Sequence, residues 1–82
     1  EVLRNLCYKI YEENREDWEK IADYIKSLFG AELEIPEYIA ERGEITMGYR
    51  EKGTLLDLSS SGRGLQQTLL ILSYMYANPN TV

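Results

Sequence analysis

The spacing of apolar residues changes twice along the chain, and this change constrains the fold more than any other feature. Up to Gly30 apolar residues recur at helical spacing, over residues 31–58 they alternate with polar residues, and from Leu65 the helical spacing returns. A period near 3.6 is typical of an amphipathic helix, and a period of two is typical of a half-exposed strand. The pattern predicts an α+β fold that joins N-terminal helices, a small antiparallel hairpin sheet and a C-terminal helix.

Two helices are predicted within residues 1–30. Asn14 is suited to cap the second helix and Gly30 to end it. The expected apolar stripes are Val2, Leu3, Leu6, Cys7 and Ile10 in the first helix, and Trp18, Ile21, Ala22, Ile25, Leu28 and Phe29 in the second.

Residues 31–58 are expected to form antiparallel strands. A polar four-residue turn over 50–53 separates two hairpin arms, the second running from Thr54 to Leu58, while the pattern leaves the shape of 37–43 unassigned. The alternating apolar residues are Leu33 and Ile35, before Pro36, and then Ile45, Met47 and Tyr49.

Length and composition exclude several classes of protein. With 82 residues, 44% of them hydrophobic, the chain corresponds to a single folded unit. The single cysteine, Cys7, and the absence of histidine exclude an internal disulfide, a zinc finger and a Ser-His-Asp site. A lone cysteine favours a reduced, cytoplasmic setting.

Charge is concentrated in the first part of the chain. Residues 1–57 carry eight Lys or Arg against fourteen Asp or Glu, and from Leu58 onward the only charge is Arg63. An acidic segment repels a phosphate backbone, so direct nucleic-acid binding by this segment is not expected. The uncharged run 65–82 contains Gln, Asn, Thr, Ser and Pro, which excludes a membrane-spanning helix there.

A run of small residues, Ser59-Ser60-Ser61-Gly62-Arg63-Gly64, leads into the last predicted helix. The N-terminus of a helix offers unpaired amide groups and a partial positive charge, and glycine lets a phosphate approach the main chain and permits positive φ. An anion site and an ordinary capped turn are both compatible with this pattern. Residues 69–77 are apolar nearly all round, so this helix needs cover on most of its circumference, which the rest of this chain is not expected to supply in full. Asn78-Pro79-Asn80 is expected to break the helix, and Thr81-Val82 to begin another strand.

The order of hairpin, Ser-Gly loop, apolar helix and Asn78-Pro79-Asn80 resembles the signature-motif region of ABC-type ATPases, specifically the AAA-labelled relatives of the SMC, RecF and OLD proteins. The resemblance covers the last third of the chain, residues 59–82. In that family the signature Ser and Gly of one subunit contact the γ-phosphate of an ATP held by the other subunit. The resemblance implies Ser60 and Ser61 as candidate hydroxyl donors, Gly62 and Gly64 as main-chain contacts, and Gln66 or Gln67 as the polar residue that closes the motif.

The resemblance also implies partners and cofactors. ATP would be shared with a second copy of the same ATPase, and Mg²⁺ would be held by residues outside this chain, because the sequence contains no Gly-x-x-x-x-Gly-Lys-Ser/Thr phosphate loop. A Walker B strand would follow Val82, so the chain by itself is not expected to hydrolyse ATP. Parents of this type act in DNA repair or in phage defence.

A different class of function is also compatible with the sequence. The chain would then be a non-enzymatic, acidic protein-interaction module that docks through its apolar C-terminal helix, with the Ser-Gly loop a simple turn.

Overall fold

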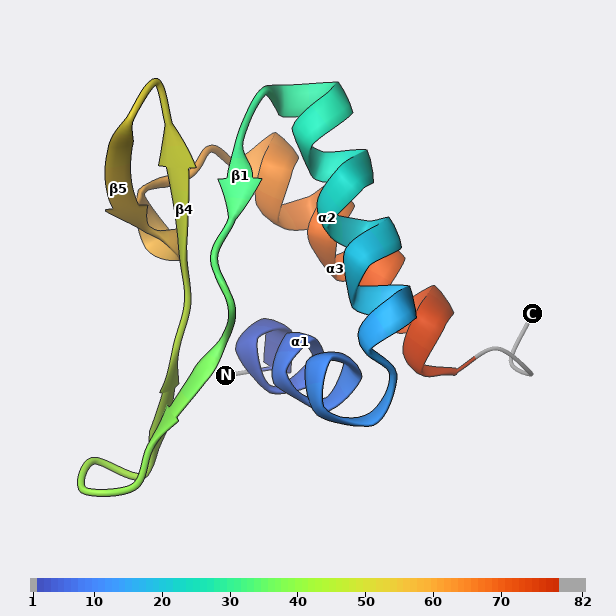
Figure 1. Ribbon diagram of the computed structural model, residues 1–82, viewed down its shortest axis with the longest axis vertical. Coiled ribbons are helices and arrows are strands. Elements are labelled where there is room, and N and C mark those ends of the chain that lie inside the picture. Colours follow the sequence, from blue (N-terminus) through green and yellow to red (C-terminus); the bar gives the residue numbers. More distant parts are fainter. Residues whose placement is uncertain (1, 79–82) are drawn as a thin grey trace.

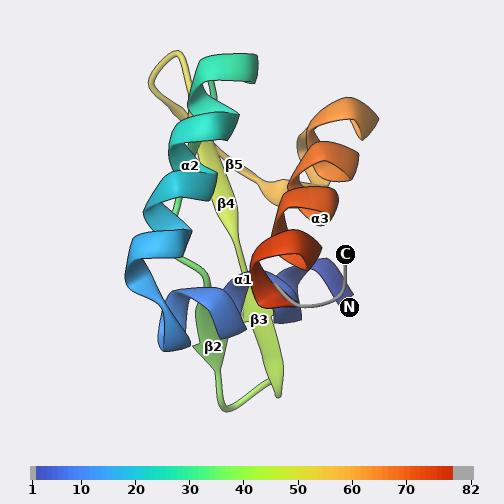
Figure 2. The ribbon, with the colours of Figure 1, turned by 90° about the vertical axis from the view of Figure 1, so that its right-hand side faces the viewer.

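The computed structural model describes residues 2–78, and over this range it has the predicted α+β architecture. The helices lie on one side of a layer of short antiparallel strands (Figure 1, Figure 2). The elements are α1 (Val2–Glu13), α2 (Arg15–Phe29), β1 (Glu32–Leu33), β2 (Glu37–Ile39), β3 (Glu44–Thr46), β4 (Gly48–Glu51), β5 (Thr54–Asp57), a 3-10 turn η1 (Leu58–Ser60) and α3 (Arg63–Ala77). The strand expected at Thr81-Val82 falls outside the described residues, as does the helix break beyond Asn78.

Helix α2 begins and ends where the sequence predicts. Asn14 caps its first turn by accepting a 3.2 Å hydrogen bond from the Asp17 amide, and Gly30 ends it in a left-handed conformation with φ 70°. The buried stripe is shorter than predicted, because Leu28 is 61% exposed and Phe29 is 37% exposed. The start of α3 covers the last turn of α2 only in part, beside Phe29, where a Cβ on Gly64 would be 3.8 Å from Phe29 Cε1.

The strands form two sheets. Strand β4 is the centre of a three-stranded antiparallel sheet in the order β1-β4-β5, and β2 pairs only with β3. The single strand predicted through Met47 is therefore two strands, because β3 before this buried residue pairs with β2 and β4 after it pairs with β1 and β5. The alternation of apolar and polar residues along one strand does not reveal a change of partner. The unassigned segment 37–43 supplies β2 and its turn. Ile35, predicted within a strand, lies between β1 and β2 and is exposed.

The turn between β4 and β5 has two residues instead of the predicted four. Lys52 and Gly53 both have positive φ, 52° and 81°. Positive φ at both positions is typical of a type I′ turn, whose twist matches that of the strands. Arg50 and Glu51, expected in the turn, instead pair with β5.

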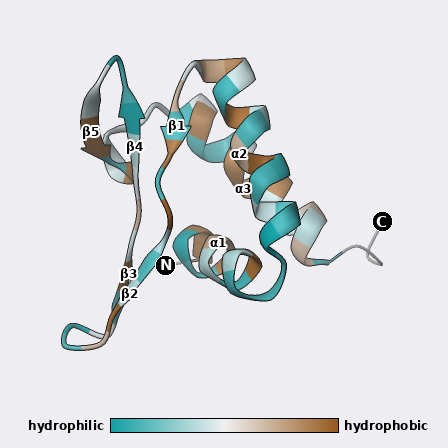
Figure 3. Cartoon of the chain, viewed as in Figure 1, coloured by the Kyte–Doolittle hydropathy of each residue, from teal (hydrophilic) through white to brown (hydrophobic). Residues whose placement is uncertain are grey.

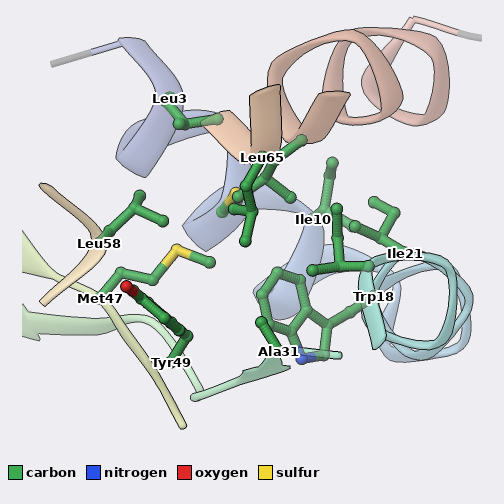
Figure 4. Close-up of a cluster of buried hydrophobic side chains, with 12 residues drawn as sticks. Leu3, Ile10, Trp18, Ile21, Ala31, Met47, Tyr49, Leu58 and Leu65 are labelled. Atoms are coloured by element: carbon green, nitrogen blue, oxygen red, sulfur yellow. The ribbon is translucent and has the colours of Figure 1, made fainter. Parts of the chain in front are cut away.

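Apolar side chains from both layers form one core (Figure 4). Leu58 and Leu65, which flank the Ser-Gly loop, belong to this core, so the burial of both leucines anchors the two ends of the loop. The members are Leu3, Cys7, Ile10, Trp18, Ile21, Ile25, Ala31, Met47, Tyr49, Leu58, Leu65 and Leu69.

Helix α3 is hydrophobic along much of its length (Figure 3) but is covered on one side only. Leu65 and Leu69 are buried where α3 packs against α1 and α2. Ile71, Tyr74 and Met75 are exposed, and we call these three residues the α3 apolar face. The described residues leave this face of the predicted buried helix uncovered, because α1 and α2 both lie on the other side of α3; the expectation that this chain cannot cover the helix in full is confirmed.

Candidate functional site

The Ser-Gly loop joins β5 to α3. Gly62 is the N-cap of α3, with extended backbone angles of φ −70° and ψ 165°, and the helix begins at Arg63. The helix therefore starts two residues earlier than predicted, and Gly64 lies in its first turn and not in the loop before it.

Neither glycine of this segment adopts the left-handed conformation considered from the sequence. The chain enters α3 directly from extended backbone, so Gly62 has negative φ and Gly64 is helical. Gly62 instead opens onto free space, and Gly64 has room for a Cβ beside Phe29. A Cβ on Gly62 would have no heavy atom within 4 Å, and a Cβ on Gly64 would lie 3.8 Å from Phe29 Cε1. A ligand can thus approach the main chain closely at Gly62, whereas the Phe29 ring borders the approach to Gly64.

The three serines differ in what their hydroxyl groups bind. Ser59 Oγ donates to Asp57 Oδ2 at 2.6 Å, and Ser61 Oγ donates to the Leu58 carbonyl at 2.7 Å. Ser60 is exposed, and its hydroxyl has no hydrogen-bond partner among residues 2–78. Of the two predicted serines, only Ser60 has a hydroxyl hydrogen available to an external ligand.

The two predicted glutamines lie in different surroundings. Gln66 is half-buried, and its side-chain amide donates to the carbonyls of Leu58 at 3.2 Å and Ser61 at 3.0 Å. Both amide hydrogens are used, so Gln66 fastens the loop to α3. Gln67 is exposed and borders a separate hollow together with Arg63.

The first turn of α3 carries unpaired amides. The first hydrogen bond of the helix runs from the Gln66 amide to the Gly62 carbonyl at 3.2 Å. In the described part of the chain, the amides of residues 62–65 have no acceptor. Such amides carry the partial positive charge of a helix N-terminus and bind anions well.

A hollow of about 260 Å³ lies beside this turn. Four of the predicted site residues line it together, which brings the free Ser60 hydroxyl close to the start of α3. Glu51 is the only charged side chain of this lining, so the positive charge that faces the hollow comes from the amides at the start of α3. The lining residues are Phe29, Tyr49, Glu51, Ser60, Ser61, Gly62, Gly64 and Leu65.

Asp57 is a residue of this region that the sequence analysis did not single out. Its Oδ2 accepts hydrogen bonds from the Ser59 hydroxyl, from the Ser59 amide at 2.9 Å and from Arg4 Nη2 at 2.9 Å. The Ser59 hydroxyl and amide, with Arg4, hold the pKa of the Asp57 carboxyl below its usual value, although its exposure to water limits the effect. An Asp side chain often binds the main chain two residues further on in a turn, so the spacing of Asp57 and Ser59 could have indicated this contact from the sequence.

No protein-family model matches the chain, and neither the curated proteins nor the solved structures give a significant match. None of the helices between residues 2 and 78 has the length and hydrophobicity that crossing a membrane requires.

Proposed function

We propose that the chain is the signature-motif part of an ABC-type ATPase head, and that its Ser-Gly loop contacts the γ-phosphate of an ATP bound by a second copy. One observation carries the proposal: the unpaired amides of residues 62–65 and the free hydroxyl of Ser60 belong to the same short segment beside one hollow. A phosphate at a helix N-terminus gains charge-assisted hydrogen bonds and a favourable interaction with the helix dipole.

The residues of the loop have distinct roles in this proposal. Ser60 donates its hydroxyl hydrogen to the phosphate. Gly62 leaves the main chain open for close approach, and Gly64 contributes its amide from the first turn of α3, beside Phe29. Ser61 and Gln66 act inside the chain, because their side-chain donors already bind carbonyl groups of the loop. The ordered loop therefore presents its amides without having to rearrange.

The proposed partners are the rest of the same ATPase and its second copy. ATP supplies the phosphate that joins the two copies, and Mg²⁺ is held by residues elsewhere. Among residues 2–78, no three His, Cys, Asp or Glu side chains are grouped so that they could hold a metal ion. We place the ATPase in the cytoplasm, in DNA repair or phage defence, with any nucleic acid bound outside this acidic segment.

The test compares Gly62→Asp with Gly62→Asn in the complete ATPase. Both side chains cap helices well and the position has room, so both variants should remain folded. Asp places a negative charge where the phosphate would bind. We expect Gly62→Asp to weaken ATP-dependent dimerisation at least about tenfold, equivalent to about 1.4 kcal/mol, and Gly62→Asn to weaken it less. Sedimentation velocity with and without ATP measures dimerisation, and nucleotide binding should be unchanged.

Serine variants complete the test. Ser60→Ala removes the donor proposed to meet the phosphate, and Ser61→Ala removes the internal hydrogen bond to Leu58. Each should weaken dimerisation. Unchanged dimerisation in Ser60→Ala, Ser61→Ala and Gly62→Asp together would overturn the proposal.

A second candidate function is favoured by the α3 apolar face. Its three side chains are 52–60% exposed although each is large and apolar. A non-enzymatic acidic module that docks a partner protein through this face would explain that exposure. This function requires the face and not the loop, so substitutions in the two regions distinguish the candidates.

A further inference from the structure

One carboxylate oxygen connects three elements beside the Ser-Gly loop. Asp57 is the last residue of β5, Ser59 belongs to η1, and Arg4 lies in α1. Asp57 Oδ2 is 2.6 Å from Ser59 Oγ, 2.9 Å from the Ser59 amide nitrogen and 2.9 Å from Arg4 Nη2. We call this group the Asp57 clasp.

The clasp fixes one end of the segment that contains Ser60. It holds the residue before Ser60 through both the main chain and the side chain of Ser59. The other end is held by Ser61 and Gln66, whose side chains bind the Leu58 carbonyl. Within the described range, Ser60 is thus the only one of the three serines whose side chain makes no hydrogen bond. Its position is set by Ser59 and Ser61, which are both held by hydrogen bonds.

The Arg4 contact adds a link to the first helix. The Arg4 side chain is only 18% exposed, whereas the other described ion pairs join side chains at least 41% exposed. A partly buried guanidinium loses less of its attraction to water screening than an exposed one. Arg4 therefore holds the Asp57 carboxylate toward α1, and it orients the oxygen that binds Ser59.

We propose that Asp57 is a positioning residue, which orders the Ser-Gly loop so that Ser60 and the amides of residues 62–65 face a ligand together. This inference rests on the proposed function for the identity of the ligand, but the ordering of the loop can be measured without any ligand. Asp57 does not itself touch the phosphate, because a carboxylate would repel it.

The test uses Asp57→Ala and, as the conservative variant, Asp57→Asn. Backbone ¹⁵N relaxation of the chain reports the order of the Ser60 and Gly62 amides. We expect their order parameters to fall from about 0.85 to below about 0.6 in Asp57→Ala. Asp57→Asn retains an oxygen that accepts from Ser59, so it should keep most of the order. The matched control is Arg42→Ala, which removes an exposed ion pair of 3.5 Å with Glu44, in the turn between β2 and β3, and should leave the loop unchanged.

Dimerisation of the complete ATPase provides the second readout. Asp57→Ala should weaken ATP-dependent dimerisation about tenfold, with nucleotide binding unchanged and with recovery in Asp57→Asn. If Asp57→Ala does not fold, Ser59→Ala removes only one hydroxyl contact and should give a smaller loss of order at Ser60.

The outcomes separate this inference from the proposed function. If the loop stays ordered in Asp57→Ala, the positioning role of Asp57 is overturned. If Asp57→Asn is as disordered as Asp57→Ala, the positioning role stands and depends on the negative charge that pairs with Arg4. If Asp57→Ala disorders the loop but Gly62→Asp and Ser60→Ala do not affect dimerisation, the positioning role stands and the phosphate-binding function is overturned.

Discussion

At the scale of single residues, the contact between Cys7 and Ser73 shows how a polar pair is accommodated in this small core. Both residues are fully buried, and Cys7 Sγ lies 3.5 Å from Ser73 Oγ, between α1 and α3. Burial raises the pKa of the Cys7 thiol to about 11, although the hydrogen bond with Ser73 lowers it slightly. The thiol is therefore neutral at physiological pH and acts as a small apolar side chain.

This pKa predicts a specific loss of stability in alkali. The folded pKa of Cys7 is about 11 and its ordinary value is 9.0. The folded state holds the proton more tightly, so the contribution to stability is complete below pH 9 and is lost as the pH rises through 11. The full loss is about 3 kcal/mol, since the pKa differs by about two units and one unit corresponds to about 1.4 kcal/mol. Urea unfolding of the wild type and Cys7→Ala at pH 8 to 10.5 measures the part of this loss that occurs below the folded pKa, about 2 kcal/mol. A difference between the two proteins that does not change with pH would contradict the prediction.

At the scale of elements, the hairpin of β4 and β5 depends on a close approach at Gly48. Gly48 begins β4 and is paired with Asp57. A Cβ at this position would lie 2.7 Å from the Leu56 carbonyl oxygen, a main-chain atom that cannot move without disturbing the strand. The hairpin therefore requires glycine here for space, not for positive φ.

Gly48→Ala should consequently destabilise the protein. We expect a loss of about 1–3 kcal/mol, the usual cost of forcing an extra carbon into a packed site. Gly64→Ala is the matched control, because its Cβ would make an ordinary 3.8 Å contact with Phe29 and alanine favours a helix. Urea unfolding should show lower stability for Gly48→Ala and no loss for Gly64→Ala. Equal stability of the two variants would show that β5 adjusts to the added carbon.

At the scale of the whole molecule, the two sides of α3 differ in their surroundings. One side packs on α1 and α2 and includes Leu69, which is fully buried. The other side is the α3 apolar face, which no described residue covers. Stability should therefore depend on the first side and association on the second.

This contrast is testable with substitutions on either side of α3. Leu69→Ala should cost about 2–5 kcal/mol, as is usual for a large-to-small change in a core. Ile71→Glu combined with Met75→Lys changes exposed positions four residues apart and should alter stability by less than about 0.5 kcal/mol. Urea unfolding measures both effects, and sedimentation velocity shows whether the double variant prevents association. A large loss of stability in the double variant would mean that the face is packed within the chain.

Local patterns in the sequence determined α2 with its two caps, the α+β class and the place of the Ser-Gly loop, because capping, helical spacing and alternation act between residues close in the chain. Tertiary structure alone decided that the strand through Met47 changes partners, that α3 is covered on one side, and that Ser59 and Ser61 bind inside the chain while Ser60 does not. These outcomes depend on atoms distant in sequence, such as Arg4 beside Asp57, which are 53 residues apart. Periodicity describes which face of an element is apolar, but only packing decides what that face meets.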